Sequence, residues 1–153
     1  MLVDAFNDLK KEIKGLKLAI AGRFYGNEAK HINLNHEGII YLKSLTQDKV
    51  AKLINAADVA VVPNPENSFT KYCFPYKVVE YMACNKPIVA TDVGDVGIFL
   101  RGFKNSLCKE NDKKDMMKKI KLQINAKKVN YRKAAMENSW ANIALKLDTV
   151  LRG

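Results

Sequence analysis

Short aliphatic runs alternate with amphipathic helical patterns along this chain of 153 residues, and this alternation constrains its fold more than any other feature. The runs lie at 16–22, 38–42, 58–62 and 88–90, with a weaker fifth at 106–108. Strands that are buried on both faces form apolar runs, and strands that alternate with helices form a parallel sheet. The sequence therefore predicts an α/β protein with a Rossmann-like parallel sheet and helices on both faces.

Five helices are predicted from apolar residues at helical spacing. Their inward-facing residues are Leu2, Phe6, Leu9 and Ile13; Val50, Leu53, Ile54 and Ala57; Val78, Val79, Met82 and Ala83; Met116, Met117, Ile120 and Ile124; and Trp140, Ile143, Ala144, Leu147 and Leu151. A shorter helix is expected at 131–137. We expect Thr46 to cap the second helix. Trp140 is expected to anchor the last helix in the core.

The segment 74–92 combines several of these signals. Pro75 suits the first position of a helix, where its missing N–H costs nothing. Lys77, Glu80, Tyr81 and Cys84 share the polar face of that helix. That face either points to water, with Lys77 and Glu80 as a simple ion pair, or lines a cleft.

The loops at the carboxyl ends of the strands are the expected ligand-binding region, because ligands bind there in open parallel sheets. These loops lie at 22–26, 43–46, 63–74 and 91–97. The first helix has no strand before it, whereas a βαβ unit begins with one. We therefore expect a further strand upstream of Leu2; the alternative is that this helix covers a sheet edge.

The formal charge of +10 suggests an acidic partner. Lysines concentrate between 104 and 133, either as a solvated helix face or as a surface for a phosphate-bearing ligand or an anionic membrane. Without interleaved aromatic residues they are a poor surface for nucleic acid, so no specific nucleic-acid partner is expected. No apolar run reaches the roughly 20 residues of a membrane span. We expect a cytoplasmic protein that can contact the inner face of the membrane.

Cysteine and histidine give no sign of a metal site. Cys73, Cys84 and Cys108 form no close-spaced pair, and we expect reduced thiols. His31 and His36 lie in a polar loop without a pattern that brings carboxylates to them. A zinc site needs four converging ligands, so no metal is expected.

Six ordered segments resemble a known family. They are Leu-Lys-Leu-Ala-Ile-Ala-Gly at 16–22, Ile-Tyr-Leu-Lys at 40–43, Ala-Asp-Val-Ala-Val-Val-Pro at 57–63, Glu-Tyr-Met-Ala-Cys-Asn-Lys-Pro-Ile-Val-Ala-Thr at 80–91, Val-Gly-Asp at 93–95 and Ser-Trp-Ala-Asn-Ile-Ala-Leu-Lys-Leu at 139–147. In this order they resemble the C-terminal, nucleotide-sugar-binding half of retaining glycosyltransferases of the GT-B fold, called group 1 or family 4. The match spans nearly the whole chain.

The resemblance implies roles for individual residues. Glu80 matches the second of the family's paired glutamates and would accept hydrogen bonds from the ribose hydroxyls. Phe74, Pro75, Tyr76 and Lys77 would contact the diphosphate. Lys43, Ser44 and Leu45 would contact the base, and Tyr72 and Cys73 would face the donor sugar. Backbone N–H groups at the helix start would face the diphosphate.

The sequence also departs from the family pattern. Tyr72 stands where the first glutamate is expected, Pro75 where glycine is usual, and Asp95 where the later landmark has its second glycine. The family's first strand carries a loop with the arginine and lysine that hold the departing diphosphate. Residues 1–153 match neither that strand nor an N-terminal acceptor domain.

From this resemblance we expect residues 1–153 to form one donor-nucleotide-binding domain, a fragment of a two-domain enzyme and half of a GT-B fold without its first strand. The enzyme would transfer a hexose from a UDP- or GDP-sugar with retention, without a metal or other cofactor, and this chain alone would be inactive. Its partners would be the nucleotide-sugar and the acceptor domain. Two alternatives remain: a nucleotide-binding regulatory module, and a basic domain that binds membranes or proteins.

Overall fold

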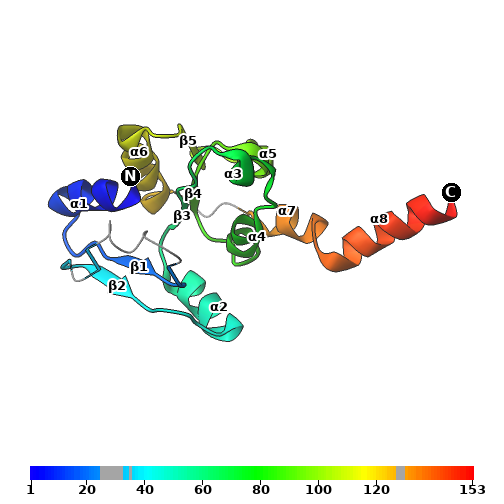
Figure 1. Ribbon diagram of the computed structural model, residues 1–153, viewed down its shortest axis with the longest axis horizontal. Coiled ribbons are helices and arrows are strands. Elements are labelled where there is room, and N and C mark those ends of the chain that lie inside the picture. Colours follow the sequence, from blue (N-terminus) through cyan, green and yellow to red (C-terminus); the bar gives the residue numbers. More distant parts are fainter. Residues whose placement is uncertain (25–32, 35, 127–129) are drawn as a thin grey trace.

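The strands all run parallel, in two separate sheets (Figure 1). The structure is a computed structural model that describes residues 1–24, 33–34, 36–126 and 130–153. One sheet contains β1 (Leu18–Ile20) and β2 (Ile39–Tyr41). The other has the order β3 (Ala60–Val62), β4 (Ile88–Thr91) and β5 (Leu107–Cys108). The predicted parallel α/β architecture is confirmed, and one strand lies at each of the five apolar runs, with β4 extending one residue beyond its run, to Thr91.

The helices follow the predicted order, with two additions. They are α1 (Leu2–Glu12), α2 (Gln47–Ala56), α3 (Ser68–Tyr72), α4 (Tyr76–Ala83), α5 (Gly94–Leu100), α6 (Lys113–Ile124), α7 (Arg132–Glu137) and α8 (Trp140–Arg152). The segments of α3 and α5 are predicted as loops from the sequence, and this prediction is wrong. Asn67 starts α3, because its side chain accepts hydrogen bonds from the N–H groups of Phe69 and Thr70. Thr70 completes this capping box in place of the usual Glu or Gln, so the usual signature does not reveal it.

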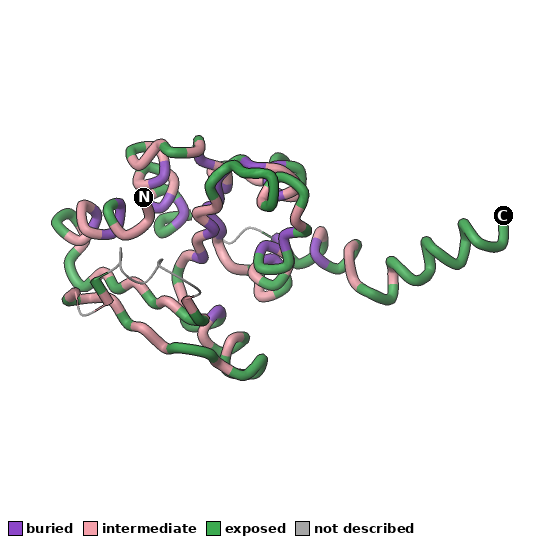
Figure 2. Tube along the Cα trace, in the orientation of Figure 1, coloured by how far each residue is buried: buried purple, intermediate pink, exposed green. Residues whose placement is uncertain are grey.

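Strand β4 lies between two hydrophobic clusters and is buried along its whole length. Ile88 and Ala90 pack into the cluster formed with α4, α5 and α7. Val89 packs on the opposite face into the cluster formed with α1 and α6. Figure 2 shows the buried residues concentrated around this central strand. Helices therefore cover both faces of this sheet, as predicted.

The burial of individual residues corrects several expectations. Leu9, Val78, Met82, Met116 and Ile120 are buried as predicted. Other residues predicted to face inward or to lie in doubly buried strands are exposed: Ala83, Ile124, Ala19 and Ile40. Ala83 and Ile124 are exposed because the helical period identifies an apolar stripe but does not fix its edges. Ala19 and Ile40 are exposed because β1 and β2 form a sheet of only two strands, as far as the described residues show.

Helix α8 projects away from the rest of the molecule (Figure 1), and most of its surface faces solvent (Figure 2). Trp140 has an exposed fraction of 77%, so its predicted role as a core anchor is wrong. The apolar stripe exists, but α7 is the main contact of α8 among the described elements. No helix in the part of the chain that the structure describes is long and apolar enough to cross a membrane.

Candidate functional site

The loops after β1 and β2 meet at the carboxyl end of their sheet. The N–H of Gly22 donates to the carbonyl of Lys43 over 2.7 Å, and the Tyr41 hydroxyl donates to the carbonyl of Gly22 over 3.0 Å. Lys43 adopts a positive φ of 53°, which directs the chain away from the strand. The predicted base-binding residues, Lys43, Ser44 and Leu45, therefore lie on a loop that is fixed to the end of β1.

Arg23 joins this group, although it is not among the residues predicted to bind a ligand. Its Nε donates to the hydroxyl oxygen of Ser44 over 3.0 Å, and the residue is exposed. A cation directly after a strand, at the end of the sheet where ligands bind, is a signal that could have identified it. The pair places a guanidinium group beside the expected base-binding loop. This group can bind an anionic or carbonyl-bearing ligand.

The segment after β3 forms a turn and the short helix α3. The Thr91 hydroxyl, at the end of β4, donates to the carbonyl of Asn64 over 2.6 Å. Helix α3 packs closely on α5. The packing leaves no room for a side chain at Gly94, since a Cβ there would lie 2.5 Å from the carbonyl oxygen of Lys71. Gly94 also has a positive φ of 53°, which favours glycine. The carboxyl ends of β3 and β4 are thus covered by two closely packed short helices.

The residues nominated to face the donor sugar, Tyr72 and Cys73, lie at the end of α3. Tyr72 has an exposed fraction of 76%, and the Lys71 amino group lies 5.6 Å from the centre of its ring. Cys73 is half-buried, and its thiol makes a weak hydrogen bond to the carbonyl of Phe74. Tyr72 is therefore accessible to a ligand. The family pattern has a glutamate at this position, so this chain offers a phenol where its relatives offer a carboxylate.

The start of α4 differs from the prediction. Pro75 is the N-cap rather than the first helical residue, and its φ of −84° and ψ of 63° form an inverse γ-turn. The N–H of Tyr76 donates within this turn to Phe74, and those of Val78 and Val79 donate to the carbonyl of Pro75. Among these first backbone donors, the N–H of Lys77 alone has no backbone partner in the described structure. The helix start therefore offers an incoming anion fewer free donors than expected.

Phe74 fixes the start of α4 against α5. Its ring contacts Phe99 edge to face, with 5.5 Å between the ring centres. It also contacts Tyr76, at 4.8 Å. Since aromatic pairs of this geometry contribute about 0.5–1.5 kcal/mol beyond their buried area, Phe74 acts mainly as a packing residue. Tyr76, with an exposed fraction of 60%, remains open to solvent.

Glu80 and Lys77 are both exposed on the outer face of α4. They form no ion pair with each other or with any other described residue, so the simple surface pair considered from the sequence is not present. Burial and, secondly, the negative charge of Glu80 raise the pKa of the neighbouring Tyr81 hydroxyl. The carboxylate and the ammonium group, one turn apart, are free to bind a ligand.

The nominated residues thus form two groups. The first combines Arg23 with the loop at 43–45, and the second combines Tyr72 with the exposed face of α4. No hydrogen bond or ion pair joins the two groups in the part of the chain that the structure describes. His31 lies outside the described residues, and His36 is bonded to the carbonyl of Glu37. Among the described residues no three His, Cys, Asp or Glu side chains gather as a metal site would require.

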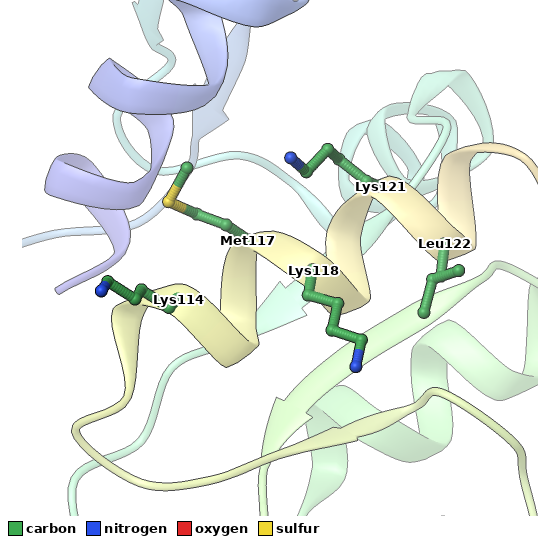
Figure 3. Close-up of a pocket in the computed structure, with 5 residues that line it drawn as sticks. All are labelled: Lys114, Met117, Lys118, Lys121 and Leu122. Atoms are coloured by element: carbon green, nitrogen blue, oxygen red, sulfur yellow. The ribbon is translucent and has the colours of Figure 1, made fainter.

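A hollow of about 340 Å³ lies elsewhere, along α6 (Figure 3). Met117 and Leu122 line it together with Lys114, Lys118 and Lys121. Lys121 is bonded to Glu12 of α1 over 2.7 Å. Lys114 and Lys118 make no ion pair in the part of the chain that is described. This hollow belongs to the lysine-rich surface and not to the strand ends.

The fold and the loops at its strand ends define an α/β domain of the open parallel-sheet class. The chain belongs to the family described as glycosyl transferases group 1, whose pattern matches residues 1–125. It is 32% identical over 142 residues to an uncharacterized glycosyltransferase of Methanocaldococcus jannaschii, covering 90% of this chain and 37% of that protein. The predicted family is therefore confirmed.

The fold is similar to that of a solved enzyme. Sucrose-phosphate synthase from Thermosynechococcus elongatus superimposes with a TM-score of 0.76 at 20% identity, over 98% of this chain and 41% of that one. At this identity the likeness shows the fold alone. It confirms the predicted GT-B-like architecture. The chain spans about two fifths of the length of both proteins.

Proposed function

We propose that this chain is the donor-nucleotide-binding half of a retaining glycosyltransferase that transfers a hexose from a UDP- or GDP-sugar. The observation that carries the proposal is the exposed and unpaired Glu80, one turn from the equally unpaired Lys77 on α4. Ionised Glu80 accepts hydrogen bonds from two neighbouring ribose hydroxyls, and Lys77 meets a phosphate. Membership of the glycosyl transferases group 1 family supports this assignment.

We also propose the remaining contacts, which the family resemblance suggests and to which Arg23 is added because it is bonded to Ser44. Arg23 and the loop at 43–45 bind the base end of the nucleotide, and Tyr72 faces the donor sugar. Because the phenol of Tyr72 replaces a carboxylate, sugar recognition here uses a neutral hydroxyl group. Retaining transfer needs cations that stabilise the departing diphosphate. Among the residues assigned here to the nucleotide, Lys77 takes that role, because we assign it to a phosphate.

Calorimetric titration of the folded chain with UDP, GDP and ADP tests the proposal. We expect binding of UDP or GDP, and the Glu80→Ala variant to weaken it by about 1.5–3 kcal/mol, because a charged hydrogen-bond acceptor is lost. The Glu137→Ala variant, which removes an exposed glutamate from α7, serves as the matched control and should bind as the wild type does. Equal affinity of the Glu80→Ala variant, or no binding of any nucleotide, would contradict the proposal.

We further propose that residues 1–153 alone transfer no sugar, since the acceptor half of such an enzyme is not among them. A radiolabelled UDP- or GDP-hexose should therefore yield no product above the Glu80→Ala level. Product above that level would disprove this part. Nucleotide binding without any transfer, even when an acceptor domain is supplied, would favour the regulatory module instead.

The hollow on α6 favours a second candidate function, binding to an anionic membrane surface. Lys114, Lys118 and the exposed side chain of Leu122 follow one another along α6 there (Figure 3). Each lysine near an anionic surface contributes about 1 kcal/mol. Co-sedimentation with phosphatidylserine vesicles should fall about tenfold or more in a Lys114→Gln/Lys118→Gln variant, and also at high salt. The Lys146→Gln variant on α8 is the control, and equal binding of all three proteins would exclude this candidate.

A further inference from the structure

Compared with the family pattern, the chain lacks one carboxylate and has gained another. Tyr72 stands where the first of the paired glutamates is expected, and Asp95 stands where the later landmark has its second glycine. The first position is the end of α3, and the second lies in the first turn of α5. The relation between the two changes therefore depends on how these helices are arranged.

Helices α3 and α5 lie side by side (Figure 1). At the start of α5, Gly94 fits so closely against the carbonyl group of Lys71 that no side chain has room there. Tyr72 and Asp95 are the residues that directly follow Lys71 and Gly94 in the chain. The tight contact of the two helices thus brings the backbones of Tyr72 and Asp95 near each other.

The face of α5 that carries Asp95 is the face that packs on this segment. Asp95 and Phe99 are four residues apart, about one turn, so they share one face of the helix. The ring of Phe99 contacts that of Phe74 edge to face, with 5.5 Å between the ring centres. Since Phe74 lies two residues after Tyr72, the Asp95 carboxylate is on the side of α5 that borders Tyr72.

The Asp95 carboxylate is open to a ligand. Its side chain is half-buried, yet it makes no hydrogen bond or ion pair with any residue that the structure describes. A carboxylate that is partly removed from water is stabilised by hydrogen-bond donors, and the hydroxyl groups of a sugar are such donors. The exposed Tyr72 beside it leaves the approach from solvent free.

We propose that Asp95 is a specificity-determining residue for the donor sugar, whose carboxylate replaces that of the family's glutamate at position 72. The inference rests on the proposed function, in which a hexose lies at Tyr72. Asp95 accepts hydrogen bonds from hydroxyl groups of this hexose, and the neutral phenol of Tyr72 borders the same sugar. The carboxylate is thus supplied from α5 instead of α3.

Calorimetric titration with and without the sugar tests this role. The folded chain is titrated with UDP and GDP and with UDP-glucose, UDP-galactose and GDP-mannose. The measured quantity is the ratio of the affinity for the best hexose conjugate to that for its free nucleotide. We expect Asp95→Asn, which keeps the size of the side chain and removes its charge, to lower this ratio about tenfold or more and to leave the affinity for the free nucleotide unchanged.

Asp58→Asn is the matched control. Asp58 is an exposed aspartate without an ion pair in the described part of the chain, but it precedes β3 and so lies at the opposite end of the sheet from Asp95. The Asp58→Asn variant should therefore have the affinity ratio of the wild type.

A rescue experiment returns the carboxylate to its family position. Asp95→Gly should lower the ratio as Asp95→Asn does. Tyr72→Glu combined with Asp95→Gly should regain most of the loss, because the carboxylate then approaches the same sugar from α3. A loss caused only by a disturbed α5 would not be rescued from α3. Urea denaturation of each variant shows whether it folds, and Asp95→Asn decides the matter if the combined variant does not.

Failure of this inference differs from failure of the proposed function. If the wild type binds neither UDP nor GDP, the proposed function fails and the role of Asp95 fails with it. If a nucleotide binds but Asp95→Asn leaves the ratio unchanged, or Asp58→Asn lowers it equally, only the role of Asp95 is overturned. A folded combined variant with no higher ratio than Asp95→Gly also overturns that role.

Discussion

Asn85 shows how one side chain connects two distant segments. It adopts a φ of 54° two residues after the end of α4, a conformation that asparagine tolerates better than most other residues with a side chain. Its Oδ1 accepts a hydrogen bond of 2.8 Å from the N–H of Tyr131 and a longer one from Arg132. Tyr131 is fully buried and its hydroxyl pairs with Ser106. Asn85 thus ends α4 and also caps the start of α7.

Replacing Asn85 separates these two roles. We expect Asn85→Ala to lower the free energy of unfolding by about 1–3 kcal/mol, because alanine disfavours the positive φ and cannot cap α7. Asn85→Gly keeps the conformation and loses only the cap, so its cost should be smaller, about 1 kcal/mol. Urea denaturation of the three proteins measures both values. An alanine variant as stable as the glycine variant would contradict this interpretation.

The three cysteines are predicted to differ in reactivity. Cys108 is buried, and burial, together with the nearby carboxylate of Asp115, raises the pKa of its thiol to about 11. Since the thiolate is the reactive form, Cys108 should not react with Ellman's reagent at pH 8 while the protein is folded. Cys73 and Cys84 are half-buried and should react. We expect the thiol of Cys108 to react only after the protein is unfolded in guanidinium chloride. Rapid reaction of all three thiols in the folded chain would contradict the burial of Cys108.

At the scale of elements, α1 and α6 are held together by charge as well as by packing. Asp8 accepts hydrogen bonds from Lys113 on α6, over 2.7 Å, and from Lys11 on its own helix, over 3.0 Å. The hydrogen bond from Lys113, followed by that from Lys11, lowers the pKa of the Asp8 carboxyl below its ordinary value of 3.8. The carboxylate therefore stabilises the fold whenever it is ionised.

The pH dependence follows from the direction of this shift. A lowered pKa in the folded state means that the contribution of Asp8 is complete above its unfolded pKa and is lost as the pH falls through the folded value. The Asp8→Asn variant should be less stable than the wild type at pH 7, and the difference should vanish well below pH 3.8. Denaturation at both pH values measures it. As a control, Asp148→Asn breaks a pair within α8 and should not weaken the contact between α1 and α6.

At the scale of the whole molecule, α8 is the element that the core does not hold. Trp140, Leu147 and Leu151 share its apolar stripe, with exposed fractions of 77%, 56% and 76%. Its N-terminus is nevertheless well formed, because the Ser139 hydroxyl oxygen accepts a hydrogen bond from the N–H of Asn142. The start of α8 is thus set by the cap at Ser139, and its apolar residues follow helical spacing, but its apolar side is exposed to solvent.

The single tryptophan reports on this exposure. Trp140 should show the red-shifted emission of a solvated indole and should be readily quenched by acrylamide at low protein concentration. Unfolding should then change its emission little. Blue-shifted, protected emission in the dilute monomer would show that α8 packs against the domain, contrary to the structure.

The elements of this domain could be predicted because apolar periodicity is a local property. The five strand positions, the order of the six predicted helices and the family all follow from the sequence, and Glu80 and Lys77 were nominated from it. Arg23 was missed because its relation to Ser44 depends on two loops that meet only when β1 and β2 pair. The inverse γ-turn at Pro75 was missed because φ of proline is compatible with both a helix and this turn.

The sequence by itself determined which residues form strands and helices, since hydrophobic spacing and turn residues act over a few positions. The tertiary structure alone decided which apolar faces are covered. β4 became the buried centre because helices pack on both of its sides, whereas β1, β2 and α8 remained partly open. Burial is a property of two surfaces in contact, and the spacing of residues along one element specifies only one of them.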